Sequence, residues 1–216
     1  MIALLGAGPH VLTIHGLDTA AIEDRLRRGL YIQDTPANRS RGVVSRLDTA
    51  LARASALPVP RAAVVTCPLV RAPDGDILSP AFAREARGPA VDGRLSRAHQ
   101  ITAYVVTLGH AWDAALDRLC AQDEAAGAWF LDQVANAWVD EAAREVERLV
   151  AADQARLGLE RTRRIRAGYA GHPSIELQAA LCLATGAERL AVAVLDSGTV
   201  TPGKTVTGIV GWEVAR

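Results

Sequence analysis

The sequence predicts an α+β fold in a single domain, residues 1–216. Segments with helical and with strand periodicity follow one another without strict alternation, which favours α+β over a doubly wound parallel sheet. No repeat and no low-complexity linker divides the chain, and its length suits one sizeable domain. Half of the residues are hydrophobic and 22% are charged, so the chain can fill a core and keep a polar surface.

Two helices are expected in the first third, so residues 1–60 should be mainly helical. Residues 18–30 begin with Asp18, which suits an N-cap, and residues 45–57 repeat the pattern until Pro58 ends it. The apolar face of the first helix consists of Ile22, Leu26 and Leu30.

Two buried strands and two further helices are expected next. Residues 61–70 and 101–109 are compact and rich in β-branched side chains, which predicts strands, while residues 79–99 predict short helices or irregular backbone. Helices are expected over residues 110–124 and 128–158. Apolar residues keep helical spacing along the longer one: Phe130, Val134, Trp138, Ala142, Val146 and Leu149.

The C-terminal part predicts one helix and two strands. Ser174 suits the N-cap of a helix over residues 174–187. Residues 190–197 and 205–214 predict strands, joined by a turn over residues 199–204.

Composition argues against two classes of partner. Lys+Arg and Asp+Glu both number 24, whereas a general nucleic-acid binder needs a basic excess. Residues 1–16 carry no basic segment before their apolar run and are too short for a membrane span, so no membrane partner is expected. Cys67, Cys120 and Cys182 are isolated and lie in apolar stretches, which predicts three buried, reduced thiols and a cytoplasmic protein.

The sequence carries no familiar catalytic or phosphate-binding pattern. Gly6 and Gly8 form a G-x-G, but the third glycine is missing and Pro9 stands where a helix should begin. The PGKT stretch at residues 202–205 lacks the earlier glycine and the following helix of a phosphate-binding loop. No histidine pair has metal spacing and no G-x-S-x-G occurs, so we expect no catalytic residue and no metal ligand.

Four carboxylates lie close together on the long predicted helix. They are Asp140, Glu141, Glu145 and Glu147. Arg144 and Arg148 lie among them, and such alternation is typical of a solvated helix face with balanced charge. We therefore expect these side chains at the surface.

A loop rich in arginine follows the long helix. Over residues 161–166, arginines are interspersed with Thr162 and Ile165. If this segment is extended, Arg164 and Arg166 point to the same side. Gly168 permits close approach to the backbone, and Tyr169 offers an aromatic face. Such a loop would suit a ligand with a carboxylate, a cationic centre and an aromatic base. The alternative is a surface turn with ordinary arginines.

Three blocks, taken in order, resemble a known family. Residues 96–116 hold an apolar strand ending in Thr-Leu-Gly, followed by a helix. The loop reads Arg164-Ile165-Arg166-Ala167-Gly168-Tyr169, with Pro173 and Gln178 after it. Residues 190–211 supply a strand, a Pro-x-x-Thr-Val-Thr turn and a closing strand. This order resembles the activation (reactivation) domain of cobalamin-dependent methionine synthase, and more closely its free-standing relatives. The resemblance spans about residues 45–213 and is strongest over 96–213.

The resemblance implies a central, mainly antiparallel, twisted sheet flanked by helices. It also implies a binding site for S-adenosyl-L-methionine. Arg164 would pair with the carboxylate of the methionyl group, and Ala167 and Gly168 would provide backbone contacts. Tyr169 would pack beside the ligand.

The resemblance also extends to the long helix, and the chain departs from the family at three positions. The family's acidic ligand contact on that helix matches Glu141, with Glu145 as the second choice. The family often has proline where this chain has Ala167, and methionine synthase has an aromatic residue where Val210 stands. Arg166 adds a positive charge beside a sulfonium site, which is unfavourable unless it points away.

The function implied is that of a stand-alone reactivation partner. The chain lacks an Asp-x-His-x-x-Gly cobalamin motif and a thiolate cluster, so cobalamin would be held in trans, on a corrinoid-binding protein or a cobalamin-dependent methyltransferase. A flavodoxin-like or ferredoxin-type reductase would supply the electron. Two alternatives stay open: a docking or assembly subunit that has lost S-adenosylmethionine binding, and a methyltransferase for a small substrate other than a corrinoid.

Overall fold

The computed structural model describes residues 8–30, 35–86, 89–167 and 175–215. This part holds a five-stranded sheet with the order β1-β2-β5-β9-β6. All four neighbouring pairs are antiparallel, which confirms the predicted fold class. The strands are β1 (His10–Thr13), β2 (Arg61–Pro68), β5 (Gln100–Thr107), β6 (Leu159–Arg161) and β9 (Thr205–Val214).

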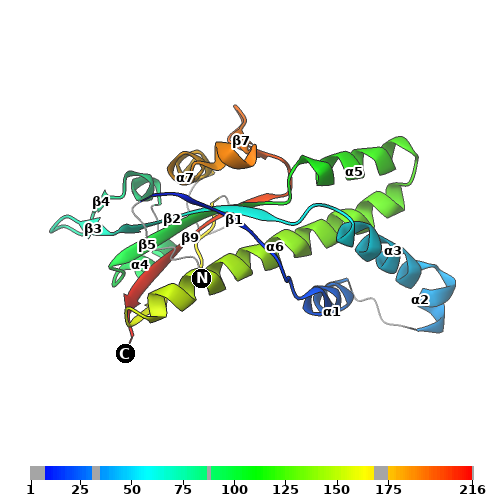
Figure 1. Ribbon diagram of the computed structural model, residues 1–216, viewed down its shortest axis with the longest axis horizontal. Coiled ribbons are helices and arrows are strands. Elements are labelled where there is room, and N and C mark those ends of the chain that lie inside the picture. Colours follow the sequence, from blue (N-terminus) through cyan, green and yellow to red (C-terminus); the bar gives the residue numbers. More distant parts are fainter. Residues whose placement is uncertain (1–7, 31–34, 87–88, 168–174, 216) are drawn as a thin grey trace.

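Helices cover both faces of this sheet (Figure 1). On one face the long α6 (Ala125–Ala155) packs against the sheet, and α1 (Thr19–Gly29), α3 (Val43–Ser55) and α5 (His110–Ala121) pack against α6. The opposite face packs against η1 (Ala81–Glu85), α4 (Pro89–Leu95) and α7 (Leu177–Thr185). The shorter elements are α2 (Pro36–Ser40), η2 (Ala187–Leu190) and two hairpins, β3–β4 (Val70–Arg71, Ile77–Ser79) and β7–β8 (Ala193–Val194, Val200–Thr201).

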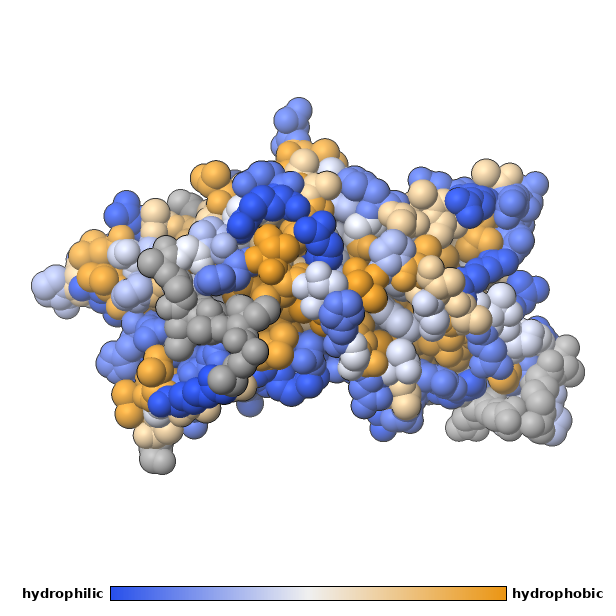
Figure 2. Space-filling model, in the orientation of Figure 1, coloured by the Kyte–Doolittle hydropathy of each residue, from blue (hydrophilic) through white to orange (hydrophobic). Residues whose placement is uncertain are grey.

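The alternation of side chains along each strand divides the core into two layers. On β5, Tyr104 and Val106 face α6, whereas Ala103 and Ile101 face α7. The molecular face in Figure 2 shows hydrophilic residues interspersed with apolar ones, and apolar residues gather near the middle of the molecule. The sheet is thus buried on both faces, and functional side chains that belong to it can be reached only from its edges.

The predicted helical periodicity agrees with most helices of the structure. On α6, the apolar face is shifted by one residue at its C-terminal end. The Asp18 side chain accepts a hydrogen bond of 2.9 Å from the Ala21 amide, as expected of an N-cap. The apolar face of α6 ends on Val150, which is fully buried, and Leu149 is 41% exposed. A spacing of four residues carries the face from Val146 to Val150, so the expectation for Leu149 was wrong.

Two further expectations also need correction. Residues 190–197 do not form a strand of the central sheet: η2 ends at Leu190, and β7 pairs only with β8 in a separate hairpin. The positive φ of 58° at Ala191 breaks the extended run. Cys120 is exposed, because α5 buries Trp112 and Leu119 on its other face. Ser174, the expected N-cap, lies outside the described residues.

Candidate functional site

The arginine-rich segment runs along the edge of the sheet. β6 pairs with the end of β9, and Ile165 forms a further bridge to Ile209. The backbone amide of Thr162 donates to the carbonyl of Gly211 at 2.9 Å. Ile165 is fully buried on the α7 side of the sheet, so the residues on either side of it face α6.

Arg164 lies between this edge and α6. Its Nε donates a hydrogen bond to Oε1 of Glu147, and its Nη1 donates to Oδ1 of Asp140 at 3.1 Å. The Arg164 side chain is only 14% exposed. Its guanidinium carbon lies 6.0 Å from the centre of the Tyr104 ring. Burial disfavours the charged guanidinium, but the neighbouring Tyr104, Glu147 and Asp140 outweigh burial and raise the pKa of Arg164.

Arg166 faces the same way as Arg164. Its Nη2 donates to the same Asp140 oxygen, Oδ1, that Arg164 contacts. The predicted common orientation of the two arginines is therefore confirmed. Burial raises the pKa of Asp140, but the guanidinium groups of Arg166, Arg144 and Arg164 outweigh that effect and lower it. Asp140 is thus a carboxylate at neutral pH and balances part of the arginine charge.

Glu147 is the most deeply buried carboxylate of this group, with 3% exposure. Its Oε1 accepts a hydrogen bond of 2.7 Å from the Tyr104 hydroxyl, and its Oε2 accepts one of 2.5 Å from Nη1 of Arg161. Burial, followed by the charge of Glu147, raises the pKa of Tyr104 well above its ordinary value. We refer to Tyr104, Asp140, Glu147, Arg161, Arg164 and Arg166 as the Arg164 cluster.

Glu141 lies beside this cluster and has other partners. Nη2 of Arg25, from α1, donates to its Oε2 at 2.5 Å, and Arg144 lies at 3.4 Å from the same oxygen. Glu145 pairs with Arg148. The carboxylates that touch Arg164 are therefore Asp140 and Glu147. The expectation of a solvated helix face was wrong for Glu141 and Glu147, because both are buried by side chains from other elements.

A hollow of about 350 Å³ opens at the Arg164 cluster. It is lined by Glu147, Arg161, Thr162, Arg163 and Arg164. Small-molecule sites commonly measure about 300 to 1,000 Å³, so this volume suits a small ligand or part of a larger one. A guanidinium has five N–H donors, and the two contacts of Arg164 to carboxylates engage only some of them. The arrangement can therefore bind an additional anion.

Of the other residues predicted for the site, Ala167 is buried in the core layer next to α7. Gly168 and Tyr169 lie outside the described residues. Val210, where the family comparison expects an aromatic residue, is fully buried in the core layer beneath α6.

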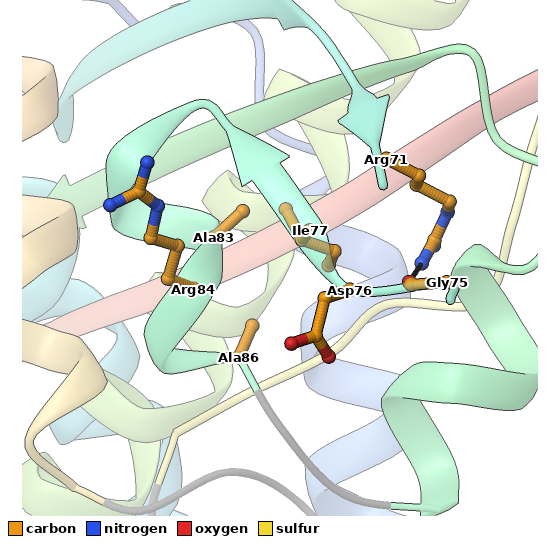
Figure 3. Close-up of a pocket in the computed structure, with 7 residues that line it drawn as sticks. All are labelled: Arg71, Gly75, Asp76, Ile77, Ala83, Arg84 and Ala86. Atoms are coloured by element: carbon orange, nitrogen blue, oxygen red, sulfur yellow. Dashed lines mark hydrogen bonds between the residues drawn. The ribbon is translucent and has the colours of Figure 1, made fainter. Parts of the chain in front are cut away.

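A second hollow, of about 200 Å³, lies at the β3–β4 hairpin (Figure 3). The Arg71 guanidinium reaches back to the carbonyls of Gly75 at 2.8 Å and Leu95 at 2.7 Å. Figure 3 shows the Arg84 side chain extending away from Arg71; Arg84 donates to the carbonyl of Leu78 at 2.9 Å. The hydrogen bonds of these two arginines thus hold the hairpin against η1 and α4, which is a structural role.

In the part of the chain that the structure describes, no three His, Cys, Asp or Glu side chains are grouped so as to hold a metal ion. None of the described helices has the length and apolar character that crossing a bilayer requires. Burial and the charge of Glu188 raise the pKa of the Cys182 thiol to about 11, so this thiol is protonated and a poor nucleophile at neutral pH.

Neither a family model nor a curated protein matches the sequence. A solved structure does match the fold: the MetH reactivation domain bound to AdoHcy. The TM-score is 0.66 and the sequence identity is 16%, over 94% of this chain and 78% of that one. The chain shares the fold of the MetH reactivation domain. The likeness extends beyond residues 96–213, where the sequence resemblance is strongest, to nearly the whole chain.

The sequence pointed to Arg164, but it did not point to Glu147, which accepts a hydrogen bond from Arg164, or to Tyr104, which donates one to Glu147. Tyr104 lies in a strand that is buried over nearly its whole length, and a phenol hydroxyl buried there needs a hydrogen-bond partner. Glu147 directly follows the buried Val146, so it borders the apolar face of α6. Both signals were present in the sequence, yet only the packing of β5 against α6 connects them.

Proposed function

We propose that this protein binds S-adenosylmethionine (SAM) at the loop from Arg164 to Tyr169 and acts as a reactivation partner of a separate corrinoid protein. Two observations support the proposal. The fold neighbour was solved with AdoHcy, which is the demethylated form of SAM. Arg164 is held at the wall of a hollow of suitable size, three residues before Ala167 in the sequence of the loop.

The Arg164 guanidinium fits the carboxylate end of SAM. A planar guanidinium binds a carboxylate through paired N–H donors, and partial burial strengthens such contacts. Arg166 shares Asp140 with Arg164, so its charge is compensated and does not stand alone beside a sulfonium. Glu141 and Asp140, neighbours on α6, would provide negative charge for the cationic part of the ligand. When bound, SAM would supply a methyl group on a positively charged sulfur.

The partner side of the proposal concerns reductive methylation of cobalamin in trans. The protein would present SAM to the cobalamin of a corrinoid-binding protein or a cobalamin-dependent methyltransferase in the cytoplasm. A flavodoxin-like or ferredoxin-type reductase would deliver the electron. The contribution of this chain would be to position the ligand and exclude bulk water, which requires no general acid or base. This agrees with the absence of a known catalytic motif in the sequence.

Isothermal titration calorimetry with SAM tests the proposal. We expect binding in the micromolar range or weaker. Arg164→Ala should weaken binding by about 2 kcal/mol, roughly 30-fold, because a hydrogen-bonded ion pair with the ligand is lost. Arg53→Ala is the matched control, since Arg53 pairs with Glu124 near the other end of α6 and should leave the affinity unchanged. Equal affinity in all three proteins would contradict the role of Arg164.

A docking or assembly subunit that has lost SAM binding is the second candidate. Its support is that Arg164 already has two carboxylate partners and that Val210 is sealed in the core. Under this alternative, the unmodified protein gives no binding heat with SAM. The same titration therefore decides between the two candidates.

A further inference from the structure

The hydroxyl of Tyr104 approaches Glu147 through a space that Gly208 leaves open. Tyr104 on β5 is paired with Gly208 on β9 in the register of the sheet. A Cβ atom at residue 208 would lie 2.9 Å from Cε2 of Tyr104 and closer still to its Cζ and Oη. Any other residue would therefore displace the ring. The glycine lets the phenol lie across β9 and reach α6.

Tyr104 and two arginines fix the orientation of the Glu147 carboxylate. Oε1 receives the Tyr104 hydroxyl at 2.7 Å and Nε of Arg164, while Oε2 receives Arg161 at 2.5 Å. Tyr104 is 1% exposed, so water does not compete for this hydrogen bond. A carboxylate held at both oxygens cannot rotate freely, and its Oε1 stays directed at Arg164.

The position of Glu147 determines which part of the Arg164 guanidinium remains available. Glu147 occupies the Nε edge, and Asp140 accepts from Nη1. The donors that these carboxylates do not engage are left for a ligand in the adjoining hollow. If Glu147 rotated, the guanidinium could turn with it, and paired contacts to a planar carboxylate depend on that orientation.

We propose that Tyr104 is a positioning residue: through Glu147, it sets the edge of the Arg164 guanidinium that receives the ligand carboxylate. This inference rests on the proposed binding of SAM. It assigns a ligand-related role to a buried strand residue that would not touch the ligand. Four residues remote in sequence, Tyr104, Glu147, Arg164 and Gly208, would thus serve the orientation of one charged group.

The test compares SAM with decarboxylated S-adenosylmethionine, which keeps the sulfonium and the amine but lacks the carboxylate. Tyr104→Phe removes one oxygen atom and changes no charge, so it isolates the hydrogen bond to Glu147. We expect Tyr104→Phe to weaken SAM binding roughly threefold to tenfold, because a less firmly oriented Arg164 side chain must be ordered when the ligand carboxylate binds. Its affinity for the decarboxylated ligand should equal that of the unmodified protein.

Two further variants complete the design. Thr102→Val removes another buried hydroxyl from β5, one that accepts a 2.7 Å hydrogen bond from Trp212 and has no contact with Arg164. It should leave the ratio of the two affinities unchanged even if it destabilises the fold. Glu147→Asp keeps the charge but withdraws the carboxylate by one methylene, so it should reproduce the selective loss seen with Tyr104→Phe.

Each outcome bears on the inference. A loss confined to SAM in Tyr104→Phe and Glu147→Asp supports it. If both ligands weaken equally, or if neither does, Tyr104 has no positioning role while SAM binding itself stands. If the unmodified protein binds neither ligand, the proposed function fails, and the inference fails with it.

Discussion

Replacing Glu147 with alanine should lower the free energy of unfolding by about 3 kcal/mol. The substitution leaves the Tyr104 hydroxyl and the Arg164 guanidinium without their shared acceptor in a shielded place. Removal of one partner from a buried ion pair typically costs about 3 to 5 kcal/mol. The lower end applies here because Arg161, the third partner, is 52% exposed and can turn to water. Urea denaturation followed by tryptophan fluorescence measures the change.

Asp24→Ala is the control for this loss. Asp24 on α1 pairs with Arg28, and the two side chains are 60% and 74% exposed. An exposed ion pair contributes well under about 1 kcal/mol. If the two variants lost stability equally, Glu147 would not be the buried centre of the Arg164 cluster.

Replacing Gly208 with alanine should cost about 2 to 3 kcal/mol. The new methyl group would overlap the ring of Tyr104, which is 1% exposed and confined between the sheet and α6. Overpacking a dense core usually costs about 1 to 3 kcal/mol, and here the ring cannot yield without leaving Glu147. The free energy of unfolding from urea titrations is again the quantity to compare.

Two comparisons test whether overlap with the Tyr104 ring causes this loss of stability. Gly93→Ala, in α4, meets no neighbour within 4 Å and should be neutral or slightly stabilising, since alanine favours the helix. In a Tyr104→Ala background, Gly208→Ala should cost much less, because the two residues are in contact and their effects are coupled. An undiminished cost in that background would show that the overlap with Tyr104 is not the cause.

Sequence periodicity predicted the framework well because the pattern is local. The β-branched run of β5 and the stripe from Phe130 to Val146 on α6 each follow from the repeat of their own element. The extended path of residues 161–166 was also predictable, because Ile165 separates two arginines at strand spacing. These features do not depend on which other element packs against them.

The chemistry of the site was less predictable because it depends on contacts between elements. A carboxylate among arginines on a helix looks like surface charge, and the burial of Glu147 depends on Tyr104 and Arg161 from two strands. The contact between Glu141 and Arg25 joins residues 116 positions apart. No local pattern distinguishes these residues from Glu145, which sequence reasoning treated in the same way.

The most direct test of the central claim is a crystal structure of this protein with AdoHcy bound. We predict that the carboxylate of the ligand lies within hydrogen-bond distance of the Arg164 guanidinium, with Glu147 still at Nε. A ligand whose carboxylate lies away from Arg164, or a crystal that stays free of ligand at saturating AdoHcy, would contradict the account.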